Sequence, residues 1–128
     1  MSNVRALHEQ AMDLAEQASI KKLRGNANEA DIILKQALAL EAQAAGRVAD
    51  DLEREPTRSV LHRSAATLAV QCGELQQAEK LIAIALAGHP PLDIAEELKD
   101  LFIQINVQRY LERRGVHLAD EQLQLLTC

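Results

Sequence analysis

The segment from Arg58 to Pro91 constrains the fold of this chain more than any other stretch of the sequence. It consists of RSVLHRSAATLAVQCGELQQAEKLIAIALAGHPP, with apolar residues at steps of three and four on both sides of Gly73. That spacing places apolar side chains on one face of a helix, and a glycine between two such patterns is typical of a helix end. Two prolines after Gly88 then stop the second helix. The segment therefore predicts two antiparallel helices joined by a short turn.

The composition favours helices throughout the chain. The 128 residues are 48% hydrophobic but only 2% aromatic, with one Tyr, one Phe and no Trp. The apolar residues are largely Ala, Leu and Ile; Ala and Leu are strong helix formers, whereas strands favour β-branched and aromatic residues. We expect a single all-α domain with closely packed helices and enough apolar surface for a core.

The charge and the sequence pattern exclude several classes of partner. The net charge is −5 and no Lys/Arg cluster offsets it, so we expect no nucleic-acid binding. No apolar run approaches the roughly 20 residues of a membrane span, and the first residues lack the apolar core of a signal peptide. Cys72 and Cys128 lie far apart, which indicates neither a disulfide framework nor a zinc site. We expect a cytoplasmic protein with no membrane partner and with free thiols.

The N-terminal part of the chain predicts a first hairpin over residues 4–52. Gly25 ends its first helix, and Asn26 with Glu29 has the spacing of a capping box, so a second helix should begin near Ala27. A short turn between two amphipathic helices makes them antiparallel neighbours. Their matching apolar faces are formed by Val4, Leu7, Ala11, Leu14, Ala15 and Ala18, and by Ala30, Ile33, Leu34, Ala37, Leu40, Ala44 and Val48.

A second hairpin is predicted over residues 56–88, and a C-terminal helix over residues 91–114. Pro56 suits the first position of a helix, and Gly73 divides the hairpin. One apolar stripe of the C-terminal helix consists of Ile94, Leu98, Leu101, Phe102 and Ile105, and a second face carries Val107, Tyr110 and Leu111. A helix with two apolar faces needs two packing partners. The short tail, residues 116–128, adds a possible sixth helix from about Asp120.

The two hairpins are offset copies of one pattern. With Gly25 placed over Gly73, an offset of 73 − 25 = 48 residues, Ala30 coincides with Ala78. The positions with the signature spacing of a tetratricopeptide repeat are His62, Ala65, Ala66 and Ala69, then Ala78, Ile82, Ala85 and Pro90. The second hairpin therefore resembles a tetratricopeptide-repeat unit. The resemblance implies antiparallel hairpins stacked as a right-handed bundle of five to six helices; a different helical bundle is the alternative.

The resemblance also implies a binding surface. In tetratricopeptide stacks the first helix of each hairpin lines a concave groove, which binds an extended peptide or a partner helix. In the register of that family, the groove residues of this chain would be Val60, Arg63, Thr67, Val70 and Gln71. Family members that clamp a carboxylate carry Asn four residues after the cation; here Thr67 follows Arg63, so we do not expect capture of a C-terminal carboxylate. The alternative is that Arg58 and Arg63 pair with nearby Glu residues on the surface.

The residues that could carry chemistry form no catalytic or metal-binding pattern. His8, His62, His89 and His117 are scattered, and no pair has the spacing of a zinc site. Cys72 has no adjacent base in the sequence, and no glycine-rich phosphate loop is present. We expect no enzyme, no metal and no cofactor. The sequence favours an interaction module whose partner is another protein, a peptide or a second copy; a homo-oligomeric structural or chaperone-like subunit is the alternative.

Overall fold

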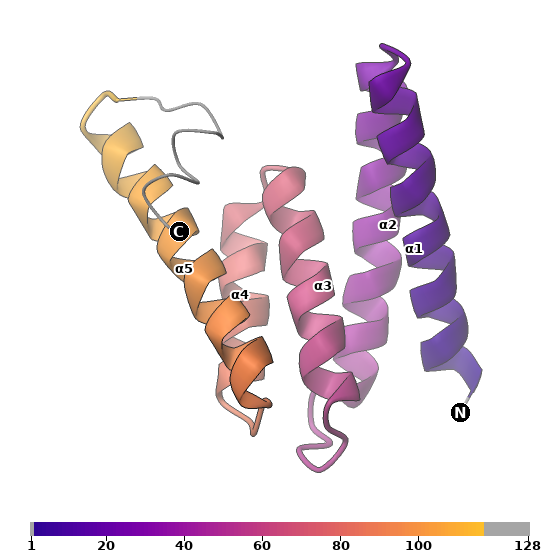
Figure 1. Ribbon diagram of the computed structural model, residues 1–128, viewed down its shortest axis with the longest axis vertical. Coiled ribbons are helices and arrows are strands. Elements are labelled where there is room, and N and C mark those ends of the chain that lie inside the picture. The colour runs from indigo at the N-terminus through magenta and orange to yellow at the C-terminus, as the bar shows by residue number, and fades with distance from the viewer. Residues whose placement is uncertain (1, 117–128) are drawn as a thin grey trace.

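The computed structural model describes residues 2–116 as an array of helices (Figure 1). The helices are α1 Ser2–Leu23, α2 Ala27–Val48, α3 Thr57–Gln71, α4 Leu75–Leu86 and α5 Leu92–Arg113. Because the described part of the chain contains helices and no strand, the all-α prediction is confirmed. The sixth helix predicted near Asp120 lies outside the described residues.

The two hairpins and α5 stack side by side, and their helices form two layers. α1 pairs with α2 and α3 with α4 through the most extensive contacts, and α2 contacts α3 between the hairpins. α5 packs against α3 and α4. In Figure 1, α1, α3 and α5 lie in the front layer, and α2 and α4 lie behind them. The first helix of each hairpin and α5 therefore share one face of the molecule.

The same glycine turn closes both hairpins. Gly25 and Gly73 have φ of +84° and +76°, in the left-handed region that glycine adopts without a Cβ clash. In each turn the glycine N–H donates to the carbonyl three residues earlier, and the next N–H donates to the carbonyl five residues earlier. These bonds satisfy carbonyls at the end of the first helix. α2 begins at Ala27 as predicted, but the Asn26 side chain makes no capping hydrogen bond.

Alanine dominates the places where the helices cross. Ala66 on α3 and Ala78 on α4 are both 0% exposed, and small side chains let two helix axes approach to about 8–10 Å. Larger buried side chains fill the space beside them, among them Leu61, Leu68, Ile82, Leu98 and Ile105. The main cluster extends from α2 to α5, and a smaller one joins the start of α1 to α2 and α3. The predicted apolar faces of the first four helices are buried or half-buried.

Arg58 is buried, so its predicted place on the surface is wrong, although it pairs with a nearby glutamate, Glu55. Its guanidinium Nε donates to the Ala49 carbonyl at 2.7 Å, and Nη2 and Nη1 donate to the Ile84 and Ala85 carbonyls at 2.8 and 3.3 Å. The Glu55 carboxylate lies 4.0 Å from Nη1. Arg58 thus donates to carbonyls after the end of α2 and at the end of α4, where helix geometry leaves carbonyls without a helical partner. The Ala85 carbonyl also accepts from the Gly88 N–H. The Arg58 bonds join the two hairpins.

Further polar side chains lie inside the helix stack, namely Ser59, His62 and Glu41. His62 is 1% exposed, and its Nδ1–H donates to the Arg58 carbonyl at 2.7 Å. Glu41 on α2 is 0% exposed, and its carboxylate accepts from Nδ1 of His8 on α1 at 2.8 Å. A buried carboxylate without such a partner would cost several kcal/mol, on the order of 3–5. The His8–Glu41 contact therefore fixes α1 against α2.

α5 departs from its predicted apolar stripe at Phe102. Ile94, Leu98 and Ile105 are buried, whereas Phe102 is 38% exposed. α5 packs on α3 and α4 along one side only, and less extensively than the other helices pack together, so its buried stripe is narrow. A residue at the margin of that stripe remains in contact with solvent, which is why the prediction for Phe102 is wrong.

Within residues 2–116, no helix combines the length and the apolar character that crossing a membrane requires.

Candidate functional site

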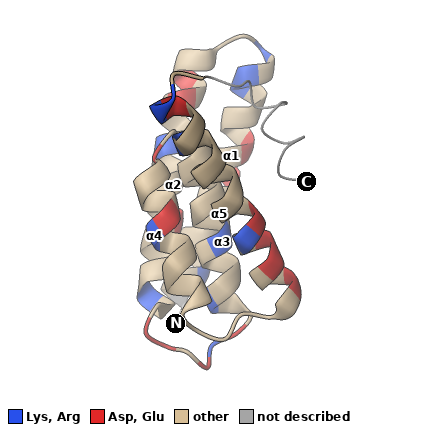
Figure 2. Ribbon diagram, turned by 90° about the vertical axis from the view of Figure 1, so that its left-hand side faces the viewer, with Lys and Arg blue, Asp and Glu red and all other residues tan. Residues whose placement is uncertain are grey.

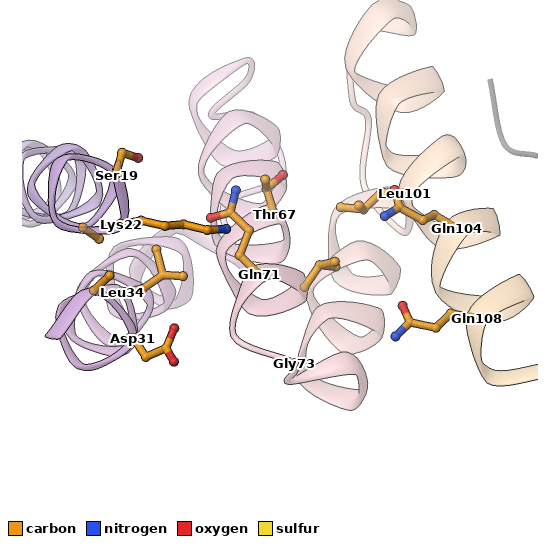
Figure 3. A pocket seen from close by; sticks show the side chains of 13 residues that line it. Ser19, Lys22, Asp31, Leu34, Thr67, Gln71, Gly73, Leu101, Gln104 and Gln108 are labelled. Carbon is orange, nitrogen blue, oxygen red and sulfur yellow. The ribbon is translucent and has the colours of Figure 1, made fainter. Parts of the chain in front are cut away.

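A groove of about 570 Å³ opens between the two hairpins and α5 (Figure 3). Its walls come from the C-terminal half of α1, the start of α2, the C-terminal half of α3 and the middle of α5. Apolar side chains of Leu34, Val70 and Leu101 line part of it. The polar side chains that line it are Ser19, Lys22, Asp31, Thr67, Gln71, Gln104 and Gln108.

The structure brings four of the five predicted site residues together. Thr67, Val70 and Gln71 line the groove. Arg63 lines an adjoining hollow of about 370 Å³ between α1 and α3, which shares Ser19, Thr67 and Gln71 with the groove. Val60 borders neither space; it is half-buried and packs against the main hydrophobic cluster. The predicted residues on the C-terminal part of α3 thus line one groove, which Val60 near the start of α3 does not reach.

Arg63 joins α3 to α5 beside the groove. Its Nη1 lies 2.9 Å from Oε2 of Glu97 on α5, and the two side chains are 31% and 55% exposed. The expectation that Arg63 pairs with a nearby Glu on the surface is confirmed. Because solvent screens an ion pair this exposed, it contributes less than about 1 kcal/mol to stability. Its role is to hold the Arg63 side chain toward α5 rather than free in the groove.

Sequence reasoning missed the contributions of α1 and α5 to the groove. In Figure 3 the Lys22 side chain extends from α1 toward Gln71, and Gln104 and Gln108 project from α5 on the opposite side. Gln104 and Gln108 are four residues apart, a spacing that puts them on one face of a helix. The spacing indicates a polar face on this helix, but only the packing of α5 in the front layer places that face in the groove.

The groove side chains retain hydrogen-bonding capacity. The Thr67 hydroxyl donates to the Arg63 carbonyl at 3.0 Å, which leaves its oxygen free to accept. The Gln108 amide nitrogen donates to Glu112 at 3.3 Å, and its carbonyl oxygen still accepts. Among residues 2–116, the side-chain carboxamides of Gln71 and Gln104 have no hydrogen-bond partner. Both can donate to and accept from a bound molecule.

In the part of the chain that the structure describes, no three His, Cys, Asp or Glu side chains converge as metal ligands would. Cys72 is half-buried beside the groove, and burial raises the pKa of its thiol, an effect that Lys35 partly opposes. The thiol is therefore protonated, and a weak nucleophile, near neutral pH.

Comparisons of this chain with protein-family models, with curated proteins and with solved structures found no match, so the resemblance to tetratricopeptide repeats stays a prediction.

Proposed function

We propose that the groove binds an extended segment of another protein and that the chain acts by this binding, without catalysis. The observation that carries the proposal is the set of hydroxyl and carboxamide side chains on facing walls, Thr67 and Gln71 on α3 and Gln104 and Gln108 on α5. A carboxamide both donates and accepts hydrogen bonds. The main chain of a peptide offers the same two kinds of group at every residue. This match between carboxamide and peptide groups favours the main chain of a peptide as the ligand over a small anion or cation.

The spacing of these side chains suits an extended peptide. On each wall the polar residues are four positions apart, 67 to 71 and 104 to 108, which is about 6 Å along a helix. In an extended chain, equivalent groups recur every second residue, after about 6.6 Å. Successive peptide groups can therefore meet successive side chains without a change of register. Two helices lined in this way act as a template for one strand.

The remaining groove residues indicate which peptides fit. Leu34, Val70 and Leu101 offer apolar contact to alternate side chains of an extended peptide, which all point the same way. Lys22 and Asp31 carry opposite charges, so the groove has no dominant sign. We therefore expect the groove to bind a nearly neutral peptide with apolar residues at alternate positions. The affinity should depend little on the salt concentration.

A random dodecapeptide library displayed on phage, selected against the full chain, supplies a probe. We expect Gln71→Ala and Gln104→Ala each to weaken binding of the selected peptide about threefold to tenfold, the effect of losing one hydrogen bond. Gln76→Ala is the matched control, because Gln76 is exposed on α4 and borders no part of the groove. The measurement is the dissociation constant by fluorescence anisotropy.

Two results would refute the proposal. One is a selected peptide whose binding is unchanged by both groove substitutions. The other is a peptide that becomes helical on binding, as circular dichroism would show, because a helix hides the main-chain groups that the groove is proposed to recognise.

A further inference from the structure

The only two aromatic residues of the chain lie on the surface of α5. The sequence contains one Phe, one Tyr and no Trp, and Phe102 and Tyr110 are 38% and 47% exposed. With Ile103, which is 48% exposed, and half-buried Val107, they line a shallow apolar hollow of about 300 Å³ on one helix. Aromatic side chains carry the largest apolar areas available to a protein. An apolar patch of this kind on a surface marks an interaction site.

Ile103, Val107 and Tyr110, which we name the outer face of α5, point away from the core, and Phe102 lies at the margin of this face. Ile94, Leu98 and Ile105 are buried on the inner side of α5, whereas Ile103, Val107 and Tyr110 follow one another at steps of four and three on the opposite side. In Figure 1, α5 is the last helix of the array, with α3 and α4 on its inner side. Among residues 2–116, no helix lies on the outer face. The groove opens beside Gln104 and Gln108, so the two surfaces are distinct.

The charges along α5 are divided between its two ends. Asp93, Glu96, Glu97 and Asp100 lie in its first half, with Lys99, and Arg109, Arg113 and Arg114 lie at its other end, with Glu112. Figure 2, which faces this end of the array, shows the acidic residues along the lower part of α5 and basic residues at its upper end. The helix thus has an acidic half and a basic half.

Two of these charges continue the apolar stripe of the outer face. Glu96 stands seven residues before Ile103 and Arg114 seven after Val107, and a step of seven residues returns to nearly the same side of a helix. The Arg114 guanidinium lies over the Tyr110 ring, 4.8 Å from its centroid. Within the described residues neither Glu96 nor Arg114 forms an ion pair. The outer face is therefore an apolar strip with one unpaired charge of opposite sign at each end.

We propose that the outer face binds a second copy of the chain, with the two α5 helices antiparallel about a two-fold axis at the level of Ile105. A two-fold interface uses the same patch twice, so it must be self-complementary. Antiparallel pairing at this level places Glu96 opposite Arg114 of the second copy at both ends, and Ile103 opposite Val107 of the second copy in the middle. A parallel pairing would instead place like charges together.

The length of the contact sets the expected strength of the dimer. From Glu96 to Arg114 the chain advances 114 − 96 = 18 residues, or about 27 Å of helix. A single pair of helices over that length lies at the small end of specific interfaces, where dissociation constants are on the order of micromolar. The dimer would leave the groove open, so this inference is independent of peptide binding.

Sedimentation velocity of the full chain across the micromolar range tests the pairing. We expect a reversible monomer–dimer equilibrium, weakened about tenfold or more by either Glu96→Arg or Arg114→Glu, because each places like charges together at both ends. The double variant E96R/R114E exchanges the two charges and is expected to restore the dimer. Arg5→Glu is the matched control: it changes the net charge as Arg114→Glu does, at an exposed site on α1.

The chain's single tyrosine gives an independent readout. Acrylamide quenching of Tyr110 fluorescence is expected to fall as the protein concentration rises, in step with dimer formation. A chain that stays monomeric at every concentration would overturn the inference. So would a double variant that dimerises no more strongly than the single variants. Strong shielding of Tyr110 in a monomer would overturn it too, because another part of the same chain would then cover the face.

Discussion

Arg58 occupies a space that only a glycine at position 88 leaves open. A Cβ added to Gly88 would lie 2.9 Å from Arg58 Cζ, and hydrogen bonds to the Ala49, Ile84 and Ala85 carbonyls prevent the guanidinium from moving away. Gly88→Ala is therefore expected to lower the free energy of unfolding by about 1–3 kcal/mol, the usual cost of overpacking. Urea unfolding followed by circular dichroism measures the change.

Gly46→Ala is the control for that prediction. Gly46 lies inside α2, and a Cβ there would have no atom within 4 Å. Alanine is a better helix former than glycine, so this variant should be more stable by about 0.5–1 kcal/mol. Equal changes in the two variants would contradict the account of Arg58.

His62 makes the stability of the fold dependent on pH. Burial lowers the pKa of His62 below its ordinary value; the hydrogen bond to the Arg58 carbonyl raises it in part, the Arg58 guanidinium lowers it, and Glu55 raises it. The unfolded chain therefore binds a proton at a pH at which the folded chain does not. Stability is full above the unfolded pKa of about 6.5 and is lost progressively as the pH falls below it.

The measurement is the urea midpoint at about pH 7.5 and at about pH 5.5, one on each side of the ordinary histidine pKa. The wild-type midpoint should be lower at the acidic pH, and His62→Gln should make the difference smaller. His89→Gln is the control, because His89 is exposed. An equal pH dependence in the wild type and in His62→Gln would show that another group is responsible.

These residue-scale contacts could not be predicted from the sequence. The carbonyls that accept from Arg58 lie 9, 26 and 27 positions away, and the partner of His8 lies 33 positions away. Nothing in the local pattern selects such partners, because they come together only once the hairpins stack. Arg63 forms its predicted surface ion pair with Glu97, 34 positions away, whereas Arg58 pairs with the nearby Glu55 but is buried.

At the scale of the helices, the turn between α3 and α4 restricts which residues position 73 can carry. Its φ of +76° is a conformation that costs a residue with a Cβ about 1–2 kcal/mol. Gly73→Ala is therefore expected to lower the free energy of unfolding by about that amount, and Gly73→Asn by less, since asparagine tolerates the left-handed region. Urea midpoints measure both. If alanine and asparagine were equally harmful, lost conformational tolerance would not be the cause.

The helices themselves were predictable because they depend on local signals. Apolar residues spaced three and four positions apart indicated the buried sides of α1 to α4. Gly25 and Gly73 indicated where α1 and α3 end. Phe102 was misplaced because the width of a buried stripe depends on how extensively a helix packs on its neighbours. On the site, the register of α3 gave Thr67, Val70 and Gln71. Lys22 and Gln104 were missed because they join the groove only through the packing of α1 and α5.

At the scale of the whole molecule, the groove depends on the helix that packs least extensively on its neighbours. α5 packs on α3 and α4 less extensively than the hairpins pack within themselves, yet it forms one wall of the groove. Local opening free energies are lowest where tertiary contacts are fewest. Native-state hydrogen exchange, recorded at dilution, should show α5 amides opening at lower free energy than α2 amides. Equal protection of α2 and α5 would mean that the array unfolds as one unit and that the groove is rigid.

The central claim is that the groove between α1, α3 and α5 receives an extended peptide. Chemical-shift mapping of the isotope-labelled chain against the phage-selected dodecapeptide tests it most directly. We predict that the largest shifts fall on the side-chain amides of Gln71, Gln104 and Gln108 and on the main-chain amides of Thr67 and Val70. Shifts confined to α4 or to the outer face of α5, with these residues unmoved, would contradict the claim.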